Sequence, residues 1–158
     1  MADRVPMRPS SYATLEAELK RLKSVERHRI VKEIETARAH GDISENAEFH
    51  AAKERQAHIE GRIIQLEDRL ARAQVIDSTG QNPDAVRFGA TVQLTDTESG
   101  DEVTYTIVGE DESDVSKGLI SVGSPIARAL LGKPVDELVT VQVPRGSRSF
   151  EIRSIRFE

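Results

Sequence analysis

Apolar residues in the first half of the chain recur at helical spacing in two separate runs. Steps of three or four residues place side chains on one face of an α-helix. The first run consists of Leu15, Leu19, Leu22, Val25, Ile30, Ile34 and Ala37. The second consists of Ala52, Ile59, Ile63, Leu66, Leu70 and Ala73 and follows a heptad repeat. One step of five, from Val25 to Ile30, interrupts the first run and predicts an irregular turn there.

The two runs match each other in reverse order. The residue numbers of facing positions, such as Leu15 with Ala73 and Ala37 with Ala52, add to a nearly constant total. This relation predicts an antiparallel helical hairpin with its turn near position 44. At 1.5 Å per residue, helices of about 30 residues would be about 45 Å long. The alanines at the far end predict a thin tip.

In the second half of the chain the apolar period changes to two, which predicts strands. The expected strands are residues 91–95, 103–108, 119–122, 139–143 and 149–157. One helix should interrupt them, with Ser124 as N-cap, Pro125 at its first position and Gly132 just past its end. We therefore expect an α+β protein, with a hairpin domain at 1–76, a linker at 77–84 and a mostly antiparallel β domain at 85–158.

The charges are spread unevenly over these parts. Residues 1–76 carry 14 Lys and Arg against 13 Asp and Glu, whereas residues 77–158 carry 8 against 14, and the whole chain has a net charge of −5. An acidic chain is not expected to bind nucleic acid strongly by itself. Cysteine is absent, which excludes disulfides and thiolate metal sites. We expect no membrane span and no signal peptide.

Residues 41–49 place three carboxylates at the expected tip, those of Asp42, Glu45 and Glu48. Two readings of this stretch are open. Asp42 and Glu45 fit a capping box, in which the first caps a helix and the second reaches back to it. The same pair could instead hold Mg²⁺ together with ligands from a partner, because two carboxylates alone do not complete its octahedron.

Other residues near the tip could contact nucleic acid. Phe49 could stack on a base, and Arg38, Lys53 and Arg55 could contact phosphates. Packing at the tip and ordinary solvated helix charge are the structural alternatives. The four histidines lack the spacing of a helical metal site and are not expected to be ligands; they are His28, His40, His50 and His58.

Residues 37–54, ARAHGDISENAEFHAAKE, closely resemble the hairpin tip of the Gre family of bacterial transcript-cleavage factors. The resemblance continues at residues 59–63, 88–92, 105–109, 120–122 and 124–128, and covers nearly the whole chain. It implies a coiled-coil hairpin followed by an FKBP-like domain. It also implies a cytoplasmic bacterial protein whose partner is RNA polymerase.

The resemblance also assigns roles. The hairpin would enter the polymerase's secondary channel, where Asp42 and Glu45 would share one Mg²⁺ and a water with the polymerase, which itself cuts the RNA. The protein would then be no enzyme and hold no cofactor alone, and we expect a monomer. Arg38, Lys53 and Phe49 would contact the nascent RNA 3′ end. The surface facing the polymerase would comprise Ile120, Ser121, Ser124, Pro125 and Arg128.

Two of these tip positions depart from the family pattern. Phe49 stands where Tyr is common and so lacks the hydroxyl, and Lys53 replaces a more usual Arg and so lacks the bidentate fork. The basic patch is short, which favours the less basic kind of factor in this family. Two other functions compete: a channel-binding regulator without cleavage activity, and a peptidyl-prolyl isomerase, for which few aromatic residues are present to line a pocket.

Overall fold

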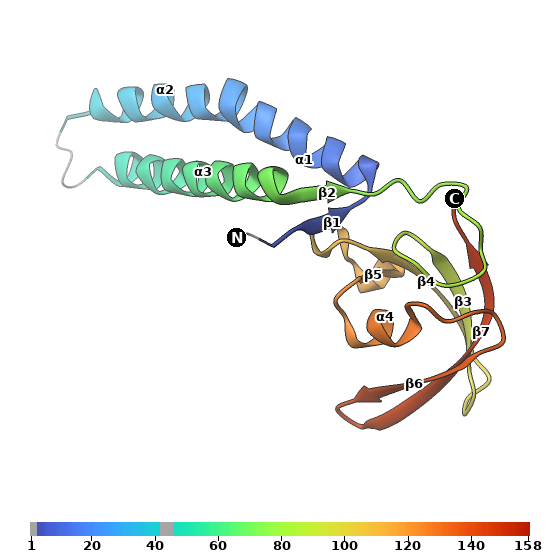
Figure 1. Ribbon diagram of the computed structural model, residues 1–158. Helices are drawn as coiled ribbons and strands as arrows, with labels where there is room; N and C mark the ends of the chain where they lie inside the picture. Colours follow the sequence, from blue (N-terminus) through green and yellow to red (C-terminus); the bar gives the residue numbers. More distant parts are fainter. Residues whose placement is uncertain (1–2, 42–45) are drawn as a thin grey trace. The chain divides into compact units, whose positions relative to one another are not determined.

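The computed structural model describes residues 3–41 and 46–158. The chain forms two compact units. The first contains Tyr12–Ala73, and the second combines Arg4–Ser11 with Gln74–Glu158. The first unit is helical and the second is built on a sheet (Figure 1). The expected α+β class, with a helical hairpin before a mostly antiparallel sheet, is confirmed.

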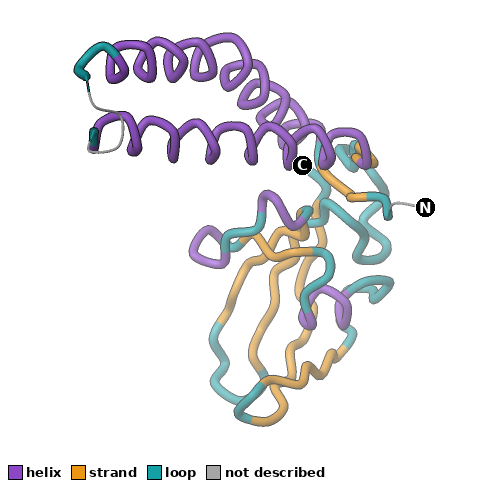
Figure 2. The backbone as a smooth tube through the Cα atoms, turned by 90° about the vertical axis from the view of Figure 1, so that its left-hand side faces the viewer, coloured by secondary structure: helices purple, strands orange, loops and turns teal. Residues whose placement is uncertain are grey.

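Two helical arms form the hairpin, and they lie side by side in both views (Figures 1 and 2). The first arm consists of α1 (Pro9–Arg21), a π-helical segment η1 (Leu22–Glu26) and α2 (Arg27–Arg38), and the second is α3 (Ala47–Arg72). The residues buried along this unit belong to the two runs predicted from the sequence; they are Leu15, Ile30, Ala37, Ala52, Ile63 and Leu66.

The π-helical segment explains the irregular step in the first run. The backbone N–H of Arg27 donates to the carbonyl oxygen of Leu22, five residues back instead of four. The wider turn absorbs one extra residue, after which Ile30 is buried again at 3% exposure. Val25 falls inside this turn and is 36% exposed. Its predicted place between the two arms was therefore wrong, because the extra residue turns its side chain outwards.

Arginine–glutamate pairs connect the two arms. Arg27 donates to both carboxylate oxygens of Glu60, at 2.9 Å each. Arg62 binds Glu18 in the same two-point manner, at 2.7 and 2.8 Å. Hydrogen bonds from the two arginines lower the pKa of Glu60 and of Glu18. Exposed pairs contribute little stability, but their planar two-point geometry favours one alignment of the arms.

The second unit contains a five-stranded sheet of order β5-β4-β3-β7-β6. Neighbouring strands are antiparallel except β4 and β5, which are parallel. The strands are β3 (Thr91–Asp96), β4 (Glu102–Val108), β5 (Leu119–Ser121), β6 (Leu138–Val143) and β7 (Gly146–Arg156). Each overlaps a strand expected from the alternating pattern, and no end differs from the expected one by more than three residues.

One α-helix and two short 3₁₀ helices accompany the sheet: α4 (Pro125–Leu130), η3 (Glu110–Glu112) and η4 (Val115–Lys117). The predicted signals of α4 are confirmed. The Ser124 hydroxyl accepts a hydrogen bond from the Ala127 N–H at 3.3 Å, and Pro125 begins the helix. Gly132, with φ of +83°, follows its end.

The core of this unit is formed by apolar residues from the sheet and from α4, including Ala127 and Leu130 at 0% exposure. Aromatic side chains take part in this packing. Phe150 is 3% exposed, and Phe88, Tyr105 and Phe157 pack against the core from its margin. The aromatic residues of this unit therefore serve its own interior.

The N-terminal strand β1 (Val5–Met7) is an integral part of the second unit, and the sequence pattern did not predict it. It pairs with β2 (Ala73–Val75), and the Ile76 N–H donates to the Met7 carbonyl at 2.9 Å. Met7 is only 1% exposed. Pro6 of β1 also passes close to the backbone of Gly109. A Cβ at position 109 would lie 2.2 Å from the Pro6 carbonyl oxygen, so glycine allows this approach.

The expected linker, residues 77–84, has no helix or strand but belongs to the second unit. Ser78 is 6% exposed, and the Gly80 N–H donates to the Phe157 carbonyl at 3.2 Å. Arg8 forms an ion pair with Glu112 within the same unit. No helix among the described residues is both long and apolar enough to cross a bilayer.

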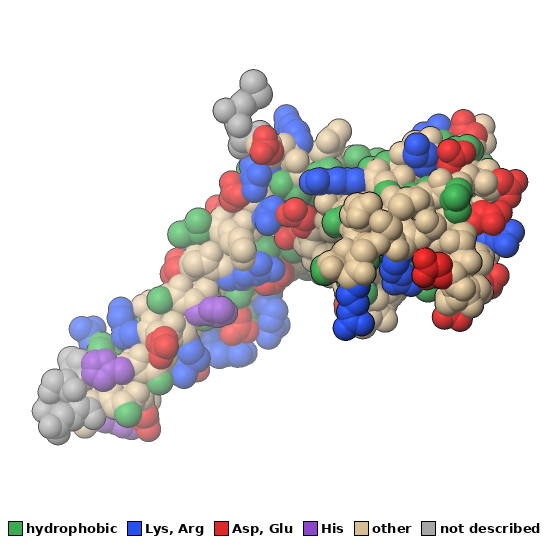
Figure 3. All heavy atoms as spheres, turned by 90° about the horizontal axis from the view of Figure 1, so that it is seen from below, with side chains coloured by type: hydrophobic (Ala, Val, Ile, Leu, Met, Phe, Trp, Pro, Cys, Tyr) green, Lys and Arg blue, Asp and Glu red, His purple; other side chains and the backbone are tan. Residues whose placement is uncertain are grey.

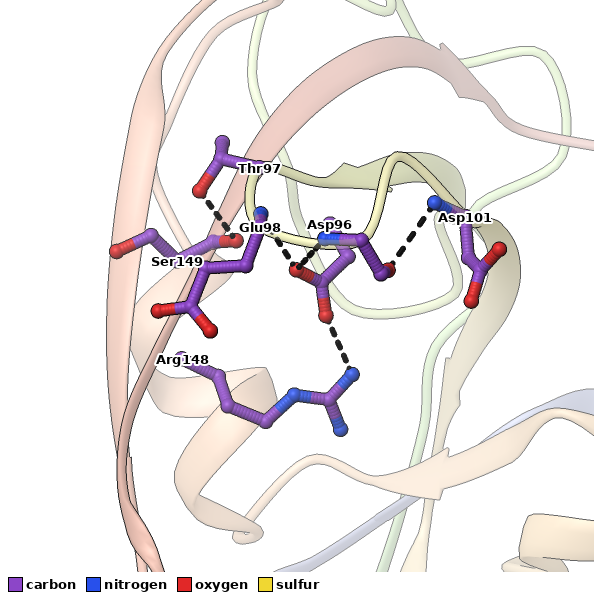
Figure 4. Close-up of polar contacts among 7 residues, drawn as sticks. Asp96, Thr97, Glu98, Asp101, Arg148 and Ser149 are labelled. Carbon is purple, nitrogen blue, oxygen red and sulfur yellow. Dashed lines mark hydrogen bonds and ion pairs between the residues drawn. The ribbon is translucent and has the colours of Figure 1, made fainter.

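The turn after β3 is fixed by Asp96 (Figure 4). Its carboxylate accepts hydrogen bonds from the Glu98 N–H at 2.9 Å and from Arg148 at 2.6 Å. The Arg148 hydrogen bond, followed by that from the Glu98 N–H, lowers the pKa of Asp96. The Arg148 guanidinium also lies over the Phe150 ring, 5.1 Å from its centre. Asp96 therefore ties the β3–β4 turn to β7.

Candidate functional site at the hairpin tip

The candidate site lies where the two arms of the hairpin are joined. α2 ends at Arg38 and α3 begins at Ala47. Asp42 and Glu45, the two carboxylates expected to hold Mg²⁺, lie outside the described residues. We call the described parts on either side, residues 37–41 and 46–53, the tip residues.

Asn46 makes two contacts that organise the tip. Its side-chain oxygen accepts a hydrogen bond from the Phe49 N–H at 3.0 Å, which makes it the N-cap of α3. Its side-chain NH₂ group donates to the backbone carbonyl of Ala37 near the end of α2. One side chain thus starts the second arm and bonds it to the first.

This cap overturns the capping-box reading of the acidic stretch. α3 begins after Asn46, so Asp42 and Glu45 precede the cap residue of α3 instead of occupying its cap and third positions. Sequence reasoning missed Asn46, although asparagine is among the strongest N-cap residues. The first helical turn also contains Glu48, whose charge suits the positive end of the helix.

The first arm ends in a tight turn. The backbone N–H groups of His40 and Gly41 donate to the carbonyl oxygens of Ala37 and Arg38, at 3.2 and 3.4 Å. Gly41 has φ of +112°, a conformation that glycine adopts readily and that residues with a Cβ atom strongly disfavour. The Ala37 carbonyl therefore accepts from both His40 and Asn46.

Small side chains bring the arms close behind the tip. Ala37 and Ala52 are 3% and 1% exposed, and both line a groove of about 460 Å³. Basic and acidic side chains surround this groove, namely Arg29, Lys32, Glu33, Glu48 and Arg55. The two alanines expected near the tip are thus buried between the arms.

Two residues expected to contact RNA lie together at the tip. The Arg38 guanidinium is 6.0 Å from the centre of the Phe49 ring, within the range of a cation–π contact. Phe49 also meets His50 edge to face, with ring centres 5.6 Å apart. Lys53 is exposed and donates to the Gln56 side chain at 3.1 Å. An aromatic ring can stack on a base, and a neighbouring cation can bind a phosphate.

The hairpin surface mixes both charge signs. Figure 3 shows one face of it, with Lys and Arg side chains among Asp and Glu, and His side chains close to the tip. His40 lies 3.4 Å from the Glu48 carboxylate. Within residues 3–41 and 46–158, no cluster of three or more His, Asp or Glu side chains could hold a metal ion.

The residues expected to face the polymerase divide into two groups. Ile120 is 4% exposed and belongs to the core. In the turn before α4, the Ser124 hydroxyl donates a hydrogen bond of 2.7 Å to the Ser121 carbonyl. Pro125 and Arg128 are exposed. Ser121 and Ser124 therefore shape the turn, Ile120 belongs to the core, and Pro125 and Arg128 present exposed side chains.

Comparison with known proteins identifies the family. The sequence model described as "Transcription elongation factor, N-terminal" matches residues 5–75, and that described as "Transcription elongation factor, GreA/GreB, C-term" matches residues 81–157. The chain belongs to the GreA/GreB family of transcription elongation factors. The resemblance noted at the tip therefore extends over both compact units.

Curated relatives in this family share more than half of their residues with this chain. "Transcription elongation factor GreA" of Anaeromyxobacter sp. (strain K) is 60% identical over 154 residues, 98% of this chain and 93% of the relative. The GreA of Trichlorobacter lovleyi is 52% identical over 158 residues, the full length of both.

Solved structures of GreA/GreB-type proteins also align along the chain. GreA factor homolog 1 of Thermus thermophilus is 28% identical, with 97% of this chain and 99% of that chain covered and a TM-score of 0.43. The GreA/GreB elongation factor of Nitrosomonas europaea is 22% identical, with 99% and 100% covered and a TM-score of 0.44.

Proposed function

We propose that this elongation factor binds RNA polymerase and stimulates the polymerase's own cleavage of backtracked RNA 3′ ends. The observation that carries the proposal is the cap of α3. Because Asn46 caps α3, the neighbouring carboxylates of Asp42 and Glu45 are not needed to cap that helix. In a chain of this family, those two acids are then available for chemistry at the end of the hairpin.

In this proposal Asp42 and Glu45 bind a Mg²⁺ ion that is shared with the polymerase. The donor chemistry fits, because Mg²⁺ is usually held by one or two carboxylates, with water and phosphate oxygens as its other ligands. When bound, the ion supplies charge stabilisation and a more acidic water. The two acids position the ion and the water, and the polymerase contributes the other ligands. The protein alone is therefore not an enzyme.

The tip residues position the RNA in the same proposal. Phe49 offers a ring face, and Arg38 supplies a positive charge 6.0 Å from that ring. Lys53, one turn further along α3, reaches for a phosphate as a point charge. These contacts hold the extruded 3′ segment, and the hairpin carries them into the polymerase's secondary channel.

The second unit provides the docking surface. Pro125 and Arg128 are exposed at α4, while Ser121 and Ser124 fix the turn that precedes it. A rigid turn lowers the entropy lost when a partner binds. Affinity for the nucleic acid then comes from the polymerase, which agrees with a net charge of −5.

A cleavage assay tests the proposal. Backtracked elongation complexes with labelled RNA are incubated with Mg²⁺ and the wild-type protein, and release of short 3′ fragments is measured. We expect Asp42→Asn and Glu45→Gln to lower the rate by more than about 100-fold, the upper range for outer-shell metal partners. Polymerase binding, measured separately, should be unchanged. Glu48→Gln is the matched control and should still support cleavage.

The same assay separates the competing functions. Polymerase binding without fragment release by the wild-type protein would identify a non-cleaving regulator. Peptidyl-prolyl isomerase activity is disfavoured because Phe150 is buried and Phe88, Tyr105 and Phe157 pack against the core. Turnover of a proline-containing model peptide would contradict that inference.

A further inference from the structure

The two edges of the five-stranded sheet differ in how they end. At the β5 edge, Asp114 and Leu119 exchange backbone hydrogen bonds of 2.8 and 3.0 Å, so the loop before β5 covers its outer side. At the opposite edge, β6 pairs only with β7 among the described strands (Figure 1). The fold therefore closes one edge and leaves the other open.

The backbone groups at the open edge follow from the pairing of β6 with β7. The Thr97 N–H donates to the Ser149 carbonyl at 3.0 Å, so the polar groups of Ser149 point away from β6. The backbone groups of Thr140, opposite Ser149, are therefore not hydrogen-bonded to β7, although the hydroxyls of the two residues lie 3.1 Å apart. Because these positions alternate, the N–H and C=O groups of Leu138, Thr140 and Gln142 point outwards.

Between Leu138 and Val143, β6 lacks the charged residue, proline or bulge that commonly protects an edge strand. Proteins commonly block such edges with lysine, proline or a bulge. The strand sequence LVTVQV contains no charge and no proline, and its register with β7 is regular from Leu138 to Val143. Val139 and Val141 face the core at 4% exposure each, whereas Leu138 is 60% exposed. The edge therefore fits strand addition.

The charges beside β6 indicate which strand would pair with this edge. Asp136 and Glu137 precede the strand, and Arg145 follows it. An identical strand laid antiparallel would bring the acidic end of each copy to the basic end of the other. A parallel arrangement would bring like charges together. A second copy of this chain is thus electrostatically complementary to this edge.

We propose that β6 pairs antiparallel with β6 of a second copy, centred on Thr140. The buried side chains of both copies lie on the same face of the joined sheet only if the twofold axis passes through a residue position. Thr140 is the middle one of the three residues whose backbone groups point outwards. Leu138 then lies opposite Gln142 of the second copy, and about six backbone hydrogen bonds form. The resulting interface is twofold and self-complementary. It replaces the monomer expected from the sequence with a concentration-dependent dimer.

Sedimentation equilibrium of the full chain tests this pairing. We expect wild-type protein to dimerise as its concentration rises, and Thr140→Pro to stay monomeric. Proline is tolerated where an edge-strand N–H faces solvent, so this variant should still fold, which circular dichroism checks. Thr140→Val keeps the N–H group and the strand preference, and should dimerise like the wild type.

Charge exchange gives a second test that does not depend on proline. Glu137→Arg and Arg145→Glu should each weaken self-association, because each places like charges at both ends of the interface. An equimolar mixture of the two variants should associate again, because position 137 of each copy then lies near an opposite charge at position 145 of the other. High salt should reduce this recovery.

Three results would overturn the proposal. One is a wild-type protein that stays monomeric up to about 1 mM. Another is equal dimerisation of wild type and Thr140→Pro, which would locate the interface elsewhere. The third is a monomeric wild type whose polymerase binding is lost in Thr140→Pro, which would assign the edge to a polymerase strand.

Discussion

Asn46 joins the two arms of the hairpin by donating a hydrogen bond to the backbone carbonyl of Ala37. The same side chain accepts from the Phe49 N–H at 3.0 Å. The geometry of the tip therefore depends on a residue that has no part in the proposed metal site. Two substitutions separate its two contacts.

We expect Asn46→Ala to destabilise the protein by about 1 kcal/mol, the usual cost of losing an N-cap. Asn46→Asp keeps the cap but loses the NH₂ group that binds Ala37. Chemical denaturation should show that the aspartate variant is the more stable of the two. Both should slow RNA cleavage. Full cleavage activity in both would mean that the contact with Ala37 does not position the tip.

The contact of Arg38 with Phe49 gives a second prediction. An exposed cation–π contact contributes about 0.5–1 kcal/mol, so its loss in Phe49→Leu should lower the cleavage rate by about two- to fivefold. Phe49→Tyr retains the ring and is the control, with an expected rate at least equal to that of the wild type. A leucine variant as active as the tyrosine variant would argue against any role for the ring.

The close approach of Pro6 to Gly109 predicts that Gly109→Ala is harmful. The added methyl would lie 2.2 Å from the Pro6 carbonyl oxygen, and such overpacking costs about 1–3 kcal/mol. Amide exchange at Ile76, whose N–H binds Met7, should speed up. Gly61→Ala is the control: it has open space on α3 and should stabilise the protein by about 0.5–1 kcal/mol.

Asp96 predicts a pH dependence of stability. Its hydrogen bonds from Arg148 and from the Glu98 N–H lower its pKa below the ordinary 3.8. A lowered pKa means that the ionised form stabilises the folded state, and that this stabilisation is lost as the pH falls through the folded-state pKa. The Tm of wild type should exceed that of Asp96→Asn by a constant amount above about pH 5.

Below pH 3.8 this difference in Tm should shrink towards zero. Asp101→Asn changes an exposed carboxylate in the same turn and is the matched control. Its Tm should follow the wild type across the whole range. A difference for Asp96→Asn that persists unchanged at low pH would mean that the Arg148 ion pair is not its source.

The sequence predicted the hairpin well because its information is local and repetitive. Buried positions such as Ile63 and Leu66 recur at heptad spacing, and their partners on the first arm follow from the reversed order. Val25 was misplaced because the apolar pattern locates an irregular step only approximately. The π-helical turn that rotates Val25 outwards depends on backbone hydrogen bonding at Leu22–Glu26, which side-chain identity alone does not specify.

Elements that depend on distant partners were harder to predict. The signals of α4 are adjacent in the sequence and were read correctly from Ser124 to Gly132. β1 is three residues long, and its partner β2 is nearly 70 positions away. The role of Asn46 could have been recognised from its residue type, but the nearby Asp42-x-x-Glu45 spacing offered a competing cap. The burial of Ile120 followed only from the packing of the sheet.

The π-helical turn at Leu22–Glu26 sets the rotational phase of everything beyond it on the first arm. An α-helix advances by about 100° per residue. The wider turn absorbs one residue without such a rotation, so deleting one residue from it would restore regular helix and leave Ile30 and Ala37 on the face that meets α3. Regular α-helix through all residues of this segment would instead rotate α2 by about that angle, and the Ala37 carbonyl would then turn away from Asn46. Backbone hydrogen bonding at a turn far from the tip in sequence thus determines which side of the first arm its end presents.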